Sequence, residues 1–305
     1  MRLISATTTA GETLGVVVGD GWRAAAELLD GGPRTMAELL AGGPDALTDL
    51  ATAAASATNI SSSSPASPVA PAAPQPLAET QLLAPVPRPG KVVAIGRNYR
   101  EHVAEEQAEP PPAPLVFAKW PSSIVGPGAD ISWDPGLTQQ VDYEAELAVV
   151  IGRTARRVSI ADALDHVLGY TCLNDVSARE IQFGDGQWVR GKSLDTFCPM
   201  GPALVTADEI GDPQDLAICC KVGDEVVQDS RTSRMYFSVA QIISYLSRSF
   251  TLEPGDVIAT GTPGGVGVFR DPPRFLGDGD RVTVEIERIG RLENTCRFVR
   301  VGSIA

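Results

Sequence analysis

The segment from Val141 to Ile151 reads VDYEAELAVVI and embeds two carboxylates in an apolar run typical of a strand. Alternate side chains of a strand share a face, so Glu144 and Glu146 are expected to point the same way. Two like charges side by side in a half-buried sheet repel each other. Either the segment is an edge strand with a solvated acidic face, or a divalent cation such as Mg²⁺, which favours carboxylate oxygens, offsets the repulsion.

A third carboxylate follows the short apolar stretch from Leu168 to Asn174, because Asp175 ends that run. An aspartate in this position can simply cap the next turn or helix. Together with the two glutamates it supplies three oxygen ligands. We therefore expect Glu144, Glu146 and Asp175 to form a metal site.

Composition places the chain among ordinary globular proteins, since 43% of its 305 residues are hydrophobic and 21% are charged. A net charge of −13 argues against nucleic acid and anionic membranes as partners, although a local cation still permits an anionic substrate. The five cysteines form no CxxC pattern, which suits free thiols in a reducing compartment. No membrane span or secretory signal is visible, so we expect a cytoplasmic location.

Frequent Gly and Pro residues between short apolar runs predict a mostly β fold with a few helices (α+β), arranged as a sandwich or roll. Residues 1–80 are expected to form a small N-terminal module, of which residues 49–80 are an Ala/Ser/Pro-rich linker. Residues 81–305 would form the main domain. In that domain we predict strands at 91–96 and 115–119 and helices at 159–168 and 239–249.

His102, one of only two histidines, precedes Glu105 by three positions in a short helical stretch. Side chains at this spacing on a helix are neighbours, and a carboxylate that orients an imidazole makes a general base near neutral pH. The alternative is an ordinary surface His–Glu pair. The other histidine, His166, lies in a predicted amphipathic helix and is interpreted as structural.

Two glycine-containing segments could complete a site. Lys192 follows a glycine in GKSLDT, and a lysine in a partly apolar cleft can stabilise a developing enolate, although most lysines are surface charges. The segment 260–267, TGTPGGVG, lacks the Lys-Ser/Thr pair of a phosphate loop. We expect it to form a tight turn that presents backbone N–H groups and the Thr262 hydroxyl.

The chain resembles the fumarylacetoacetate hydrolase superfamily over roughly residues 88–290, because five segments occur in the order seen there. They are GRNY at 96–99 with His102 and Glu105, DYEAEL at 142–147, NDVSAR at 174–179, GKSLDT at 191–196 and GTP at 261–263. The segment after Gly264 is most similar to members that act on 2,4-diketo acids.

The resemblance implies a mixed β-sandwich roll, a homodimer, and Mg²⁺, or alternatively Mn²⁺ or Ca²⁺, as the bound metal. It also implies that a helix carrying the His–Glu dyad acts as a lid. The site residues that it implies are the metal ligands Glu144, Glu146 and Asp175, the catalytic residues His102, Glu105 and Lys192, and the substrate contacts Gln182 and Thr262.

From these residues we expect a metal-dependent hydrolase that cleaves a C–C bond of a 2,4-dioxo acid, acylpyruvate-like or fumarylacetoacetate-like, into a pyruvate-type acid and a carboxylic acid. His102, oriented by Glu105, would take a proton from water, and Lys192 would hold the developing charge. The same site also suits an oxaloacetate decarboxylase or a 2-hydroxy-dienoate isomerase or tautomerase, which the sequence does not separate. A non-catalytic binding protein would not need the dyad.

Overall fold

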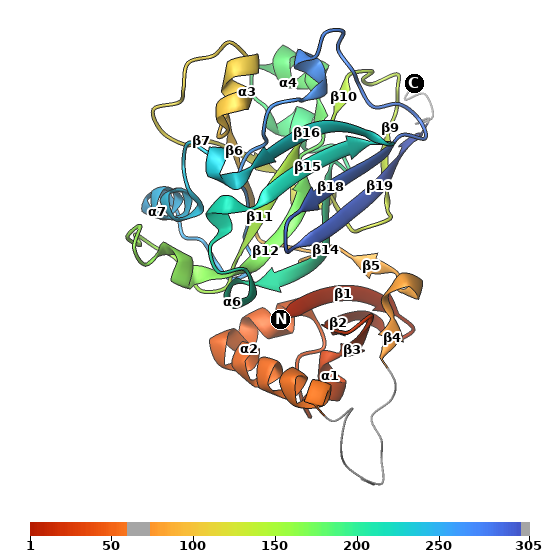
Figure 1. Cartoon of the computed structure of the whole chain (residues 1–305), viewed down its shortest axis with the longest axis vertical. Helices are drawn as coiled ribbons and strands as arrows, with labels where there is room; N and C mark the ends of the chain where they lie inside the picture. Colours follow the sequence, from red (N-terminus) through yellow and green to blue (C-terminus); the bar gives the residue numbers. More distant parts are fainter. Residues whose placement is uncertain (60–73, 300–305) are drawn as a thin grey trace, which may run out of the picture.

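A mixed sheet of twelve strands runs through the computed structural model, which describes residues 1–59 and 74–299 (Figure 1). Most neighbours are antiparallel, whereas β17 pairs in parallel with β6. In spatial order the strands are β4 (Gln75–Pro76), β3 (Gly21–Ala24), β2 (Gly11–Val18), β1 (Arg2–Thr8), β14 (Cys198–Thr206), β12 (Val167–Asn174), β11 (Ala145–Ile151), β17 (Val257–Ala259), β6 (Val92–Gly96) and β7 (Leu115–Lys119). Two short strands join this path at the side, β5 (Leu82–Leu83) on β1 and β8 (Ile124–Val125) on β14.

A second sheet faces the first, and one hydrophobic core fills the space between them. Leu147 and Val149 of β11 belong to the same buried cluster as Ile218 and Val284 of the second sheet. The strands of the second sheet are β16 (Glu225–Arg231), β15 (Ala217–Val222), β18 (Arg281–Ile286), β19 (Gly290–Phe298) and β9 (Asp130–Trp133). A separate pair is formed by β10 (Val141–Asp142) and β13 (Ser177–Ala178). This packing of two sheets confirms the predicted mostly β, sandwich-like fold.

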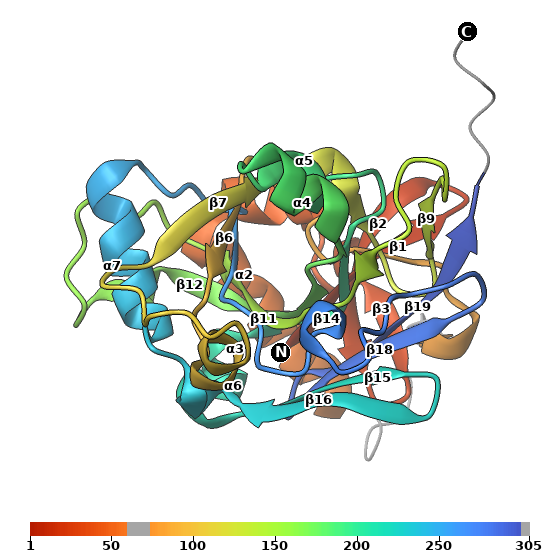
Figure 2. The same cartoon turned by 90° about the horizontal axis from the view of Figure 1, so that it is seen from above.

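Apart from α2 (Met36–Asn59) and α7 (Val239–Ser249), the helices in the described part of the chain are short, and none is long and apolar enough to span a membrane. The other α-helices are α1 (Ala25–Leu28), α3 (Arg100–Glu105), α4 (Arg179–Asp185), α5 (Val189–Lys192) and α6 (Ala207–Ile210). Single 3₁₀ turns are η2 (Leu77–Glu79), η3 (Pro121–Ser123), η4 (Ala163–His166), η5 (Pro213–Asp215), η6 (Thr232–Arg234) and η7 (Gly267–Phe269). Helices α3 and α4 lie at one end of the sheets (Figure 1), with α5 beside α4 in the view from above (Figure 2).

The predicted helix at 239–249 is confirmed as α7, and the predicted strand at 115–119 is β7. A capping box starts α7, in which the Ser238 hydroxyl accepts from the Gln241 N–H and the Gln241 side chain accepts from the Ser238 N–H. The predicted helix at 159–168 is wrong, because only a 3₁₀ turn forms there. Val167 instead starts β12, opposite Ile151 of β11, so the apolar residues belong to a buried strand.

The first 59 residues form three strands and two helices that lie below the main body in Figure 1. Strand β1 pairs with β14 of the main body, with Arg2 opposite Val205, so one sheet spans both parts. Helix α2 is interrupted at Gly43, which has φ 68° and ψ −160° and precedes Pro44. The predicted linker begins within this helix, and its residues 60–73 lie outside the described residues. The division at residue 80 stays a prediction.

Candidate active site

Three carboxylates meet where strands β10, β11 and β12 end. Glu144 lies between β10 and β11, Glu146 is the second residue of β11, and Asp175 directly follows β12. Because β11 and β12 pair with Ala145 opposite Asn174, their ends coincide, and the Asp175 N–H donates to the Glu144 carbonyl at 2.8 Å. One oxygen of each carboxylate lies within 4.8 Å of the others, and all three residues are buried.

The run from Val141 to Ile151 is not one continuous strand, because Tyr143 and Glu144 separate β10 from β11. Strand β11 lies between β12 and β17 inside the large sheet, and all seven of its residues are buried. The alternative of a solvated acidic edge strand is therefore wrong. The acidic pair lies instead in the interior, where unbalanced charge is costly.

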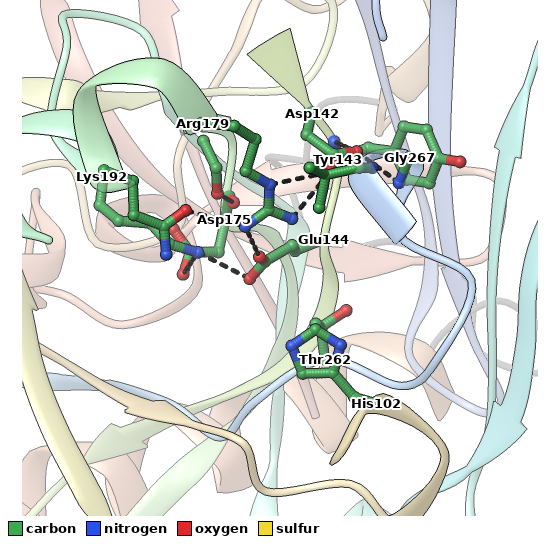
Figure 3. Close-up of polar contacts among 12 residues, drawn as sticks. His102, Asp142, Tyr143, Glu144, Asp175, Arg179, Lys192, Thr262 and Gly267 are labelled. Carbon is green, nitrogen blue, oxygen red and sulfur yellow. Dashed lines mark hydrogen bonds and ion pairs between the residues drawn. The ribbon is translucent and has the colours of Figure 1, made fainter. Parts of the chain in front are cut away.

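Two lysines and an arginine neutralise part of the carboxylate cluster. Figure 3 shows two of these cations, Lys192 and Arg179, beside Glu144. Nζ of Lys192 donates to Oε2 of Glu144 at 2.7 Å and to Oδ2 of Asp175 at 2.9 Å. Nζ of Lys119 donates to Oδ1 of Asp175 at 2.6 Å, and Nη1 of Arg179 lies 2.8 Å from Oε1 of Glu144. Burial alone would raise the pKa of Glu144, but the charges of Lys192 and Arg179 outweigh it and lower this pKa to about 2.

Glu146 is the member of the cluster for which the described residues provide no lysine or arginine partner. Its Oε2 accepts a hydrogen bond from the Gly261 N–H at 2.8 Å. Burial raises the pKa of Glu146 well above its usual range, and the nearby charges of Asp175 and Glu144 raise it further. Three clustered oxygens with one uncompensated carboxylate suit a hard divalent cation. These residues therefore fit the implied metal, and they would hold it together.

Asp142 organises the loop that follows the glycine-rich segment (Figure 3). Its Oδ1 accepts from the Gly267 N–H at 2.8 Å, and its Oδ2 accepts from the Val268 N–H at 3.0 Å and from Nε of Arg179 at 2.8 Å. A Cβ at Gly267 would lie 2.6 Å from Oδ1 of Asp142 and would clash with the carbonyl oxygen of Arg274. Only glycine fits there. Asp142 therefore connects this loop to Arg179, which in turn contacts Glu144.

Helix α3 places His102 between two carboxylates. Nδ1 of His102 lies 2.7 Å from Oε1 of Glu105, as the spacing of three predicts, and Nε2 lies 3.0 Å from Oε1 of Glu106. The second oxygen of Glu105 accepts from the Gly265 N–H at 2.6 Å. Burial alone would lower the pKa of His102, but the hydrogen bonds to Glu105 and Glu106 outweigh it and raise this pKa to about 9. The two carboxylates thus favour the imidazolium form of His102, whereas the sequence suggests a general base.

Gln182 and Thr262, the expected substrate contacts, are both buried and tied to neighbouring side chains. Oε1 of Gln182 accepts from Nη1 of Arg179 at 2.9 Å, which leaves its amide hydrogens available. Oγ1 of Thr262 accepts from Nε2 of Gln228 at 2.8 Å, so the hydroxyl hydrogen is free to be donated. Gln228 also donates to the Pro263 carbonyl at 2.8 Å and thereby holds the turn in place.

These groups converge on one small cavity of about 40 Å³. Its polar lining consists of Arg97, His102, Glu106, Glu144, Glu146, Arg179, Gln182, Lys192 and Thr262. Its apolar side chains are Ile95, Phe117, Phe183, Trp188 and Phe269. Asp175 and Glu105 reach this lining through Lys192 and His102. The structure therefore brings all eight predicted site residues together, while their roles stay predictions.

Sequence reasoning assigned no role to Glu106, Lys119 or Gln228. Glu106 lies four positions after His102, and this helical spacing is a signal that could have found it. Lys119 ends strand β7 and is 56 positions away from Asp175, so no local pattern links the two. Its ammonium group also donates to the backbone carbonyl of Lys192. Gln228 approaches Thr262 only through the pairing of the second sheet.

The family model described as "Fumarylacetoacetate (FAA) hydrolase C-terminal" matches residues 91–297. The chain is 50% identical over 221 residues to the human oxaloacetate tautomerase FAHD2A, whose name places it in mitochondria, with 72% of this chain and 70% of the relative covered. It is 47% identical over 221 residues to the oxaloacetate tautomerase YisK of Bacillus subtilis, with 72% and 73% covered.

Among solved structures, the fumarylacetoacetate hydrolase from the psychrophile Exiguobacterium antarcticum is similar over nearly the whole chain. The TM-score is 0.82 at 36% sequence identity, and the likeness covers 98% of this chain and 100% of that chain. The similar proteins thus bear the names of a tautomerase and of a hydrolase. The fold and family are shared among them, whereas the named reactions differ.

Proposed function

This chain belongs to the fumarylacetoacetate hydrolase family, and from that premise we propose that it is a metal-dependent tautomerase of a small anionic keto acid, with oxaloacetate as substrate. The reaction interconverts the enol and keto forms of the acid. Two relatives at 50% and 47% identity bear the name oxaloacetate tautomerase, which supports this choice of substrate and reaction.

The observation that carries the proposal is the position of His102 in the cavity of the carboxylate cluster, with a carboxylate oxygen within 3.0 Å of each ring nitrogen. Hydrolysis of a C–C bond needs a group that removes a proton from water. An imidazolium with a carboxylate at each ring nitrogen has no free lone pair for this task. Tautomerisation towards the keto form needs a proton donor, and an imidazolium is a proton donor. The geometry therefore favours the tautomerase over the hydrolase that the sequence suggests.

The cluster of Glu144, Glu146 and Asp175 would hold a divalent cation, which supplies positive charge that favours the enolate form of a bound keto acid. The free hydroxyl hydrogen of Thr262 and the free amide hydrogens of Gln182 are available to bind a substrate carboxylate. Aromatic side chains also line the cavity.

His102 moves the proton. In the direction from enol to keto, an N–H bond of the imidazolium breaks and a C–H bond forms at the carbon next to the carbonyl. The enol O–H bond breaks, and its proton returns to the imidazole. One proton is given and one is regained, so the reaction consumes no further reactant.

The experiment that tests this function follows the ultraviolet absorbance of enol-oxaloacetate with the full chain, in Mg²⁺ and in EDTA, against a Mg²⁺ blank without enzyme. We expect the enol to be consumed faster in Mg²⁺ with enzyme than in the blank, with no release of CO₂, and expect EDTA to abolish the difference. Acetylpyruvate is assayed in parallel for cleavage. Metal-dependent cleavage of acetylpyruvate without faster tautomerisation would establish the hydrolase instead, and CO₂ release from oxaloacetate would establish a decarboxylase.

A further inference from the structure

Glu106 lies just beyond the end of helix α3, and each of its carboxylate oxygens has a cationic partner. Oε1 lies 3.0 Å from Nε2 of His102, and Oε2 accepts from Nε of Arg97 at 2.6 Å. The side chains of Glu106 and His102 are 12% and 8% exposed, so solvent screens their contact only weakly. Arg97 has a left-handed backbone with φ 55°, which is uncommon for a residue with a Cβ. The surrounding fold therefore enforces this arrangement.

The two carboxylates at His102 differ in what holds them. Glu105 is anchored to the backbone at Gly265, whereas Glu106 is anchored to the guanidinium of Arg97 and itself lines the cavity. A neutral imidazole has one N–H and can donate to one carboxylate only. Because Glu105 contacts Nδ1, a second proton on Nε2 is stabilised by the carboxylate of Glu106.

Other groups that act on His102 do not replace this contact. The carboxylate of Glu144 raises the pKa of His102 through space, and the ring of Phe269 lies 6.2 Å from the imidazole centroid. The positive charge of Arg97 reaches the imidazole across Glu106, which separates the two cations. The acceptor at Nε2 is therefore Glu106 itself.

We propose that Glu106 is a positioning residue that, held by Arg97, keeps a proton on Nε2 of His102 and orients the imidazole towards the shared cavity. This role rests on the proposed proton transfer by His102. In this step the Nε2–H bond breaks as the substrate C–H bond forms. The enol O–H bond then breaks, and its proton re-forms the Nε2–H bond. In this role, Glu106 keeps the imidazole of His102 protonated at the start of each reaction cycle.

The test compares Glu106→Gln with Glu101→Gln in the Mg²⁺-loaded full chain. Glu101 lies on the same helix α3, its side chain is 38% exposed, and its Oε1 pairs with Arg234 at 2.6 Å, so it is a matched control outside the cavity lining. Because the chain has only two histidines, NMR titration can follow His102 with His166 as the reference signal. We expect the His102 titration to move down by about one pH unit or more in Glu106→Gln and to stay in place in Glu101→Gln.

The pH profile of kcat for enol-oxaloacetate gives a second readout that a merely structural role would not move. We expect its alkaline limb to shift down with the His102 titration in Glu106→Gln. In Glu106→Asp, which keeps the charge, we expect a smaller shift, and this variant serves also if the glutamine variant does not fold. Unchanged titration and pH profile in the Glu106 variants of an active enzyme would overturn the role of Glu106 and leave the tautomerase standing. A shifted titration in an enzyme that does not accelerate tautomerisation would support the positioning and refute the proposed function.

Discussion

Nε2 of His102 lies 3.0 Å from Oε1 of Glu106, four positions further along the chain. This contact changes the chemistry that the His102–Glu105 pair by itself suggests. A histidine oriented by one carboxylate keeps a lone pair and acts as a base, whereas a histidine between two carboxylates carries both protons. We propose that the second carboxylate turns the site from activating water towards delivering a proton.

Replacement of His102 by Asn should abolish most of the tautomerisation, because no other described imidazole lines the cavity. We expect kcat to fall by roughly 10²- to 10⁴-fold, the range typical of a lost acid–base group. Enol-oxaloacetate consumption in Mg²⁺ measures this. His166→Asn is the control, since His166 lies on the 3₁₀ turn η4 and should leave kcat unchanged. Equal rates for the His102 variant and the wild type would remove His102 from the mechanism.

The stability of the metal-free protein should depend on pH through His102. Its folded pKa of about 9 lies above its ordinary 6.5, so the folded state binds this proton more tightly. The resulting stabilisation is fully present below pH 6.5 and is lost as the pH rises through about 9. We expect the free energy of unfolding to decrease across this window by up to ~3 kcal/mol. Urea unfolding in EDTA measures the decrease, which should be smaller in His102→Asn; an equal decrease in both proteins would contradict the assignment.

Glu146→Gln should remove a buried carboxyl group whose charged form has no cationic partner, while keeping an acceptor for the Gly261 N–H. In EDTA we expect this variant to be at least as stable as the wild type. The rise in Tm that Mg²⁺ produces in the wild type should be lost, because a ligand oxygen and its charge are gone. Calorimetry with and without Mg²⁺ measures both effects. A variant that still gains Tm from Mg²⁺ as the wild type does would show that the metal binds elsewhere.

Glu144→Gln should have the opposite effect on the metal-free protein. It breaks ion pairs with Lys192 and Arg179 and leaves these cations buried without their partner. We expect a loss of stability of ~3 kcal/mol or more, since breaking a buried pair typically costs this much. Urea unfolding in EDTA provides the measurement. Equal stabilities of the Glu144 and Glu146 variants would contradict the unequal charge compensation seen in the structure.

Gln228→Leu tests the support of the substrate contact Thr262. The substitution removes the donor to Oγ1 of Thr262 and the acceptor for the Ala145 N–H, and leaves the Pro263 carbonyl unpaired. We expect a loss of stability of about 2–4 kcal/mol from the unpaired buried groups. KM for oxaloacetate should rise more than kcat falls. The exposed Gln139 provides a control, because Gln139→Leu should change neither stability nor KM; a Gln228 variant that behaves like this control would contradict the role.

Several contacts of the site follow from spacing alone. His102 and Glu105 lie one helical turn apart, so their 2.7 Å contact needs only helix α3. Glu144 and Glu146 were expected together from strand alternation, and they do meet, although Glu144 lies outside the strand. The helix predicted at 159–168 failed because Val167 and Leu168 have a pattern that suits a helix and a strand equally well, and pairing with β11 decided for the strand.

The sequence by itself determined the family, the mostly β class, the three acids and the His–Glu pair, because these depend on local patterns and on motifs in order. Tertiary structure decided the charge state of these groups. Lys119 is 56 positions away from its partner Asp175, Lys192 is 48 positions away from Glu144, and Glu146 is left without a paired cation. Ionisation in a buried site depends on every charge within a few ångströms, and only the folded chain sets those distances.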